Sequence, residues 1–280
     1  MAGLFDIASS GIRAYREALA VTGQNIANID TEGYRRRGAA LSEISASQND
    51  ITSIADQTGL GVRVEGISRA FDSFISGRAR DASSDFSQAE AHAVGLETLE
   101  GALVPGDYDL GYFLGEFFDG LSGVAQAPGD LAARTVALTK GSALANGFVQ
   151  LSQDLSELRE TIWQETANVT DEVNGLLVTL RNTQSQLIAS GSASGASNAI
   201  LDARDQTISE IATLVGVAVS STASGAATVT LGRSGNGPVL GSATQTGSLQ
   251  VQQSDDRLVF LAGQSPGLAE TQQVSSGRLA

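Results

Sequence analysis

Residues 144–187 read LANGFVQLSQDLSELRETIWQETANVTDEVNGLLVTLRNTQSQL, and their apolar spacing decides the fold. Apolar side chains recur at alternating steps of four and three, which keeps one stripe of an α-helix facing a partner. One extra residue between Val169 and Val173 shifts the stripe without ending it. No proline interrupts residues 129–237. We therefore predict a single helix over residues 142–189, about 70 Å long.

The chain after this helix changes from helical spacing to a period of two. Small residues at 190–197 predict a loop, and apolar residues at 200–214 predict a shorter returning helix. From Val215 onward, apolar residues alternate with polar ones and glycine-rich turns separate them, which is typical of antiparallel strands. The predicted strands are centred on Val217–Val219, Val229–Leu231, Leu249–Val251 and Leu258–Ala262, with turns at Gly232–Gly237, Gly241–Gly247 and Ser254–Asp256.

The segments before the long helix are shorter and more varied. Residues 36–58 are polar and irregular, and residues 59–67 alternate like a short strand. Helical spacing returns over residues 70–100, and a compact apolar cluster at 112–124 predicts a short helix. Pro105–Asp107 and Pro128–Asp130 separate these helices, because proline and glycine interrupt helical structure.

The first segment carries a second regular apolar stripe, which predicts a helix of coiled-coil type. Such a stripe needs a partner, and no equally long apolar helix lies nearby in the chain. The alternative is an ordinary amphipathic helix that packs on its own domain. The stripe consists of Phe5, Ala8, Ile12, Tyr15, Leu19, Thr22, Ile26 and Ile29.

These patterns predict a mainly α protein with a smaller β part: an N-terminal coiled-coil-type helix, a bundle of long helices and an antiparallel β-region. We expect four parts, namely a helix at 1–35, an irregular linker with a short strand at 36–84, a helical bundle at 85–215 and a β-rich region at 216–280. The tail resembles the beginning of another element, so we expect the sequence to be part of a longer protein.

Charge is divided unevenly along the chain and argues against several kinds of partner. Residues 1–80 carry nine Arg and nine Asp or Glu, so the net charge of −14 arises within residues 81–280. An acidic body repels the phosphates of nucleic acids and the headgroups of anionic membranes. The N-terminus lacks the basic and apolar pattern of a cleaved secretory signal.

The residues that catalysis and metal binding need are scarce. The chain has no cysteine, and His92 is its single histidine, placed on a predicted helix without a nucleophile elbow. Gly235–Gly241 has the wrong glycine spacing for a dinucleotide loop and is better interpreted as a hairpin turn. We therefore expect no enzyme activity, no catalytic residue, no metal and no cofactor.

The motif with the most functional information is Asn25-Ile-Ala-Asn28-Ile-Asp-Thr-Glu-Gly33-Tyr34, at the end of the first helix. Its asparagines can bond to the backbone, and its glycine suits a turn. The complete string resembles the signature of flagellar rod, hook and hook-associated proteins. Glu32 and Arg35 depart from that signature, which usually has proline and a small polar residue there.

Later segments resemble the hook-associated branch of this family, and in particular the family of the first hook-associated protein. These are residues 143–148, which resemble the long helix of that family, and residues 200–205 and 210–217, which together resemble its returning helix and first strand. The resemblance implies a structural protein of the hook–filament junction whose terminal helices find their partners only on assembly. The implied interface residues are Phe5, Ile12, Tyr15, Leu19, Asn25, Ile26, Asn28, Gly33 and Tyr34.

The same resemblance implies the partners and the location. We expect contacts with further copies of the chain, with hook protein, with a second hook-associated junction protein and with a flagellar export chaperone. The expected location is the extracellular flagellum, reached without a cleaved signal peptide. A rod or hook protein is the near alternative, and a coiled-coil adhesin or signalling module is the distant one.

Overall fold

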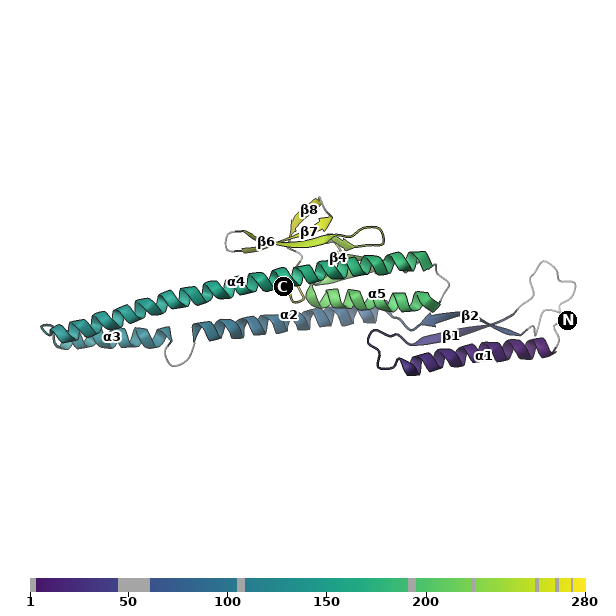
Figure 1. Cartoon of the computed structure of the whole chain (residues 1–280), viewed down its shortest axis with the longest axis horizontal. Helices are drawn as coiled ribbons and strands as arrows, with labels where there is room; N and C mark the ends of the chain where they lie inside the picture. The colour runs from purple at the N-terminus through teal and green to yellow at the C-terminus, as the bar shows by residue number, and fades with distance from the viewer. Residues whose placement is uncertain are drawn as a thin grey trace.

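The chain forms a long rod of helices with small sheets along its side (Figure 1). The computed structural model describes residues 4–44, 61–104, 109–190, 195–222, 225–254, 257–264, 267–272 and 274–280. The predicted beginning of a strand at 59–60, the break at Pro105–Asp107 and parts of the turns at 190–197 and 254–256 lie outside these residues. The described helices are α1 (Leu4–Ala27), α2 (Ser73–Leu103), α3 (Leu110–Gln126), α4 (Leu131–Ser190) and α5 (Gly195–Leu214).

Helix α4 has 60 residues and is longer than the sequence predicted. It begins eleven residues earlier than expected, where Asp130 Oδ1 accepts a hydrogen bond of 2.8 Å from the Ala132 amide. Its first turns pack antiparallel against α3, with Gly120 of α3 lying close to the backbone of Ala137 (Figure 1). The heptad stripe misses this stretch because α4 contributes small residues to the contact, such as Ala137 and Gly141, the latter beside Phe117 of α3.

All described strands are antiparallel, and they form three small sheets. The hairpin of β1 (Arg37–Glu43) and β2 (Val62–Arg69) lies beside α1. The second sheet contains β3 (Val217–Ser221), β4 (Ala227–Leu231) and β5 (Val239–Gly241), and the third contains β6 (Ser248–Ser254), β7 (Arg257–Gln264) and β8 (Gly267–Thr271). The predicted fold class, mainly α with a smaller antiparallel β part, is confirmed.

The described residues of the segment at 36–84 contain the β1–β2 hairpin and the beginning of α2 at Ser73. The helix agrees with the helical spacing predicted over 70–100, but it begins twelve residues before the expected start of the bundle. Asp72 caps this helix, since its Oδ1 accepts hydrogen bonds from the amides of Phe74 and Ile75 at 2.9 and 3.0 Å. The sequence prediction also missed β1, β5 and β8, which are short or carry few large apolar residues.

The hydrophobic core lies where the second half of α4 meets α5 and the two sheets that follow it (Figure 1). Two polar side chains of α4 attach the helix to these sheets. Asn174 exchanges two hydrogen bonds with the backbone of Leu249, and Gln184 Oε1 accepts one from the amide of Ala227. Fully buried apolar side chains there include Val173, Leu177, Leu180, Ile208, Ile211, Val215, Val229, Leu231, Leu240 and Leu249.

Two valines of α4 provide a matched test of this core. Val173 is fully buried, whereas Val178 is 54% exposed on the same helix. We expect Val173→Ala to lower the free energy of unfolding by about 2 kcal/mol, because it removes buried methyl groups and leaves a cavity. Val178→Ala should change it by less than about 0.5 kcal/mol. Urea unfolding followed by circular dichroism measures both, and equal effects would place the core elsewhere.

Candidate assembly interface

Helix α1 has two stripes of side chains, and only one of them is packed within the chain. The packed stripe consists mainly of small residues and faces the β1–β2 hairpin, with Ala14 and Val21 at its centre, both buried, and the half-buried Ile7 near its start. Ser10 belongs to it: its hydroxyl donates to the carbonyl of Ile7 at 2.7 Å and accepts from the amide of Val62 at 3.2 Å. The sequence prediction missed this stripe, although its small residues follow the same alternating spacing.

The apolar stripe that the sequence predicted lies on a different face and is exposed. Phe5 is 90% exposed and Leu19 is 70% exposed, and Ile12, Tyr15, Ile26 and Ile29 are all more than 60% exposed. We call these six residues, five on α1 and Ile29 in the turn just after it, the seam. Large apolar side chains in such a row on one helix are typical of a surface that another chain covers.

The position of α1 corrects one expectation. The helix was expected to have no partner within its own chain, but it packs against the hairpin through its small-residue stripe. The seam keeps the property that the sequence suggested, because its large side chains are exposed in the described part of the chain. Docking and exposure are compatible because a helix presents more than one face.

The motif at the end of α1 forms a closed turn around Asn25. The side-chain amide of Asn25 donates to the carbonyl of Arg37 at 2.8 Å, while its Oδ1 accepts from the Arg37 amide at 2.8 Å. The same Oδ1 accepts from the Tyr34 hydroxyl at 2.9 Å. One side chain therefore ties the end of the helix to the beginning of β1, and asparagine suits the position because it supplies both a donor and an acceptor.

The other motif residues complete this turn. Asn28 donates to the carbonyl of Gln24 at 2.8 Å and so satisfies the last turn of the helix. Gly33 has φ of +77°, and a Cβ there would lie 2.7 Å from Oε1 of Gln206 on α5. The guanidinium of Arg37 lies 5.0 Å from the centre of the Tyr34 ring. The predicted set therefore divides into five exposed apolar residues on α1 and four residues that shape the turn.

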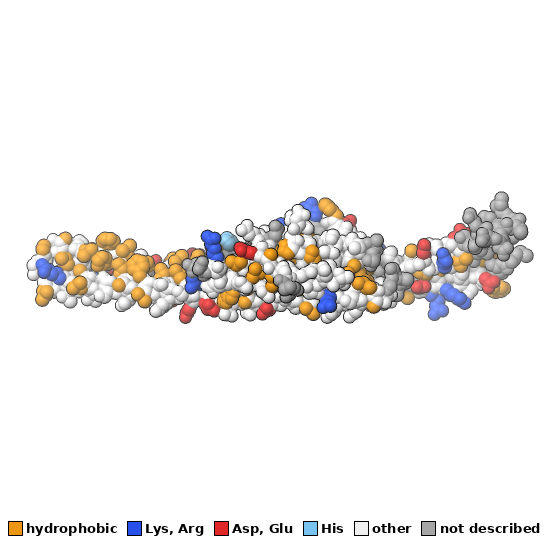
Figure 2. All heavy atoms as spheres, turned by 90° about the horizontal axis from the view of Figure 1, so that it is seen from above, with side chains coloured by type: hydrophobic (Ala, Val, Ile, Leu, Met, Phe, Trp, Pro, Cys, Tyr) orange, Lys and Arg blue, Asp and Glu red, His pale blue; other side chains and the backbone are white. Residues whose placement is uncertain are grey.

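A second apolar surface lies at the far end of the rod. Figure 2 shows apolar side chains gathered where α3 and the first turns of α4 form the tip. Exposed large side chains there include Leu114 and Phe118 on α3, and Leu131 and Leu138 on α4. Two packed helices cover only the sides that face each other, and the other apolar side chains of α3 and α4 stay exposed. This surface is therefore a further candidate for contact between proteins.

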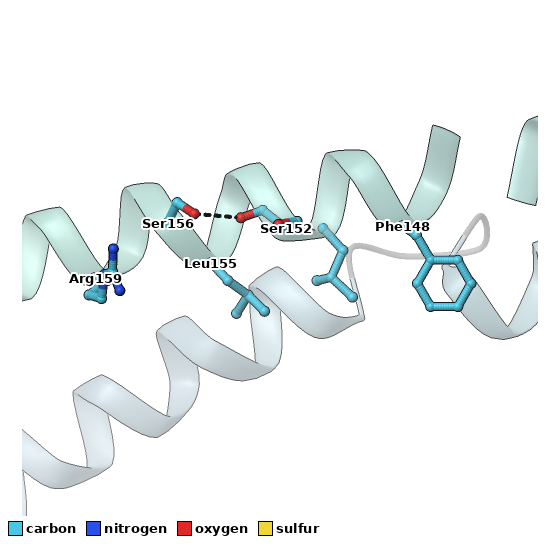
Figure 3. Close-up of a pocket in the computed structure, with 6 residues that line it drawn as sticks. Phe148, Ser152, Leu155, Ser156 and Arg159 are labelled. Carbon is cyan, nitrogen blue, oxygen red and sulfur yellow. Dashed lines mark hydrogen bonds between the residues drawn. The ribbon is translucent and has the colours of Figure 1, made fainter. Parts of the chain in front are cut away.

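A groove of about 430 Å³ follows α4, and its lining does not suit catalysis (Figure 3). It is lined by Phe148, Leu151, Ser152, Leu155, Ser156 and Arg159. The Ser156 hydroxyl donates to the backbone carbonyl of Ser152 at 2.7 Å, so it bonds within its own helix.

Within the described ranges, no group of three or more acidic or histidine side chains is placed to hold a metal ion. None of the helices in those ranges has the length and apolar character of a membrane span.

Comparison with protein families decides the relationship. The model of the flagellar hook-associated protein FlgK helical domain matches residues 96–280, about two thirds of the chain. The chain belongs to this family. The model of the flagella basal body rod protein matches residues 5–35, which hold α1 and the turn around Asn25. These matches confirm the resemblance that the motif and the later helices suggested.

Individual relatives agree with this assignment. Flagellar hook-associated protein 1 of Escherichia coli (strain K12) is 29% identical over 222 residues, which cover 79% of this chain and 40% of the relative. The protein of the same name from Bacillus subtilis (strain 168) is 27% identical over 224 residues, covering 79% of this chain and 44% of the relative. The chain therefore spans about two fifths of the curated relatives it matches.

A solved structure shares the fold. It is that of the flagellar hook junction protein FlgK from Burkholderia pseudomallei, which matches with a TM-score of 0.61 and 20% sequence identity. The match covers 72% of this chain and 37% of that chain. The arrangement of long helices and small sheets described above is therefore a family fold.

The turn around Asn25 can be tested with two neighbouring residues. Asn25→Ala removes three hydrogen bonds, so we expect amide exchange in residues 33–37 to accelerate about tenfold or more. Gln24→Ala, at an exposed position next to it, should leave the exchange unchanged. Hydrogen–deuterium exchange with mass spectrometry measures both. Protection that survives in Asn25→Ala would show that other contacts hold the turn.

Two glycines separate backbone strain from helix propensity. Gly33→Ala should destabilise the folded chain by about 1–2 kcal/mol, since φ is positive there and Gln206 occupies the space of the added Cβ. Gly23→Ala, inside α1 with open space around it, should stabilise by about 0.5–1 kcal/mol. Chemical unfolding of both variants gives the sign, and the same sign for both would contradict this view of the turn.

Proposed function

We propose that this chain is a structural, self-assembling subunit of the bacterial flagellum that acts at the junction between hook and filament, and that it is not an enzyme. The observation that carries the proposal is the exposed seam of α1, on a helix whose other stripe is already packed. Membership of the hook-associated family supports it, as do the names of the relatives.

Assembly would bury the seam against helices of neighbouring copies or of other axial proteins. Each large apolar side chain that becomes fully buried contributes about 1.5–3 kcal/mol before the cost of association. Several such side chains in one row supply enough free energy to favour ordered contacts, while one isolated contact does not. The four turn residues have a different role that precedes assembly: they fix the direction in which the chain passes from α1 into β1.

The charge distribution fits this division of labour. The net charge of −14 arises within residues 81–280, where basic residues are few, whereas the N-terminal 80 residues have no net charge. Copies of a neutral segment can therefore pack closely without strong repulsion, and the acidic body keeps the remaining surface soluble.

The proposed partners are further copies of the chain, hook protein, a second hook-associated junction protein and a flagellar export chaperone. The proposed location is the extracellular flagellum, after export without cleavage of a signal peptide. The match of residues 5–35 to the rod protein model keeps a rod or hook protein as the nearest alternative. Deletion separates the two, because loss of a junction protein leaves hooks without filaments.

The test compares a negative charge placed on the seam of α1 with the same charge placed on another exposed face of the helix. Leu19→Asp or Ile26→Asp should leave the body folded and abolish incorporation, because a carboxylate cannot be buried in an apolar contact without a large cost. Ala20→Asp adds the same charge at an exposed position off the seam and should permit incorporation. The measurement is electron microscopy of hooks and filaments in a deletion strain that expresses each variant. Normal filaments with the seam variants would refute the proposal.

A further inference from the structure

A cluster of buried charges joins the β1–β2 hairpin to α5, and we call it the neck: Arg37, Arg69, Asp202 and Asp205. Arg69 Nη1 lies 3.0 Å from Asp202 Oδ1, and its Nη2 lies 2.6 Å from Asp205 Oδ2. Arg37 Nη2 lies 3.5 Å from Asp202 Oδ2. None of these side chains is more than 14% exposed. Residues far apart in the sequence therefore meet in one shielded cluster.

The neck is anchored in the body of the molecule. Arg204 on α5 donates from Nε to Asp205 Oδ1 at 3.0 Å and from Nη1 to the carbonyl of Gly225, at the turn between β3 and β4. Burial lowers the pKa of the nearby Arg80 guanidinium, and Asp205 acts in the opposite direction. Asp205 is therefore held by the body on one side and by the hairpin on the other.

The two arms of the neck differ. Arg69 uses both terminal nitrogens on two carboxylates, and its guanidinium lies 4.5 Å from the centre of the Phe71 ring. The Arg37 arm is looser and leaves Arg37 Nε and Asp202 Oδ2 without hydrogen-bond partners in the described structure. Arg69 therefore carries the better-defined contact.

A charged contact of this kind fixes orientation more than it adds stability. Desolvation offsets much of the attraction in a buried ion pair, so an apolar contact would hold the hairpin as firmly. A guanidinium fork that meets two carboxylates is satisfied in one geometry only, whereas apolar surfaces can slide. The neck is therefore suited to setting a direction.

Among the described residues, other contacts across this joint are made by single side chains of α5. Residues 70–72 alone connect β2 to α2 along the chain. The side-chain amide of Asn198 on α5 donates to the carbonyl of Ile67 at 2.7 Å, and Gln206 lies beside Gly33. Because α1 packs on the hairpin, whatever holds the hairpin also holds α1 and its seam.

We propose that Arg69, supported by Arg37, Asp202 and Asp205, is a positioning residue that fixes the direction of α1 relative to the α4–α5 body and so presents the seam for assembly. The inference rests on the proposed function for its biological meaning. Its physical content, a fixed angle between two parts of one chain, can be measured without assembly.

The measurement uses spin labels, which the absence of natural cysteines makes simple. One label is placed at Gln24→Cys on α1 and the other at Gln186→Cys on α4, both at exposed positions. A second pair within α4, Gln153→Cys and Gln186→Cys, reports on the body alone. Double electron–electron resonance then gives the distribution of the distance between the two labels, for the otherwise unmutated chain and for each variant.

Arg69→Met keeps an apolar stem and removes the fork, so the distribution between α1 and α4 should broaden while the pair within α4 stays unchanged. Arg63→Met is the matched control, since Arg63 lies exposed on the same strand and its Nε donates to Ser42 Oγ at 3.4 Å. It should leave both distributions narrow. Asp202→Asn removes charge from the other side of the neck and should act like Arg69→Met.

The outcomes separate this inference from the proposed function. An unchanged distribution in both Arg69→Met and Asp202→Asn would overturn the fixed angle. Broadening together with normal incorporation into flagella would overturn the positioning role. Broadening with loss of incorporation, while Arg63→Met assembles normally, is the expected result. Failure of the unmutated chain to assemble would count against the proposed function alone, because the distances between the labels on α1 and α4 test the neck without assembly.

Discussion

The packing of small side chains on α1 against the β1–β2 hairpin is the contact on which the rest of the arrangement depends. It uses Ser10, Ala14 and Val21, together with the half-buried Ile7, and so leaves the large apolar residues of the seam exposed. The helix is thereby held and oriented while its seam remains exposed. A helix that buried the seam within its own chain would leave nothing for neighbours, and a helix without the small-residue stripe would have no fixed position.

Two further sets of polar contacts connect α1 and the hairpin to the rest of the chain. Asn25 closes the end of α1 onto β1, and the neck connects the hairpin to α5 and from there to the core around α4. In the proposed arrangement, the polar neck, and not the apolar core, fixes the angle between α1 and the α4–α5 body.

Much of this could be predicted from periodicity, and the exceptions have physical reasons. The stripe from Leu144 to Leu187 predicted α4, but the first turns were missed because α4 packs on α3 there through small residues such as Ala137 and Gly141, which leave no large apolar pattern. The seam was found because its residues are large, and the docking stripe was missed because its residues are small. The roles of Asn25 and Arg69 depend on partners 12 and more than 130 residues away, which no local pattern contains.

The central claim is that the seam is open in the isolated chain and closed in the flagellum. Thiol labelling tests it most directly, with Leu19→Cys on the seam and Ala14→Cys in the docking stripe as the reference, since Ala14 is 3% exposed. The account predicts that Leu19→Cys reacts rapidly in the monomer and is protected in purified hook–filament structures, whereas Ala14→Cys is protected in both. A protected Leu19→Cys in the monomer, or one that stays equally reactive after assembly, would contradict it.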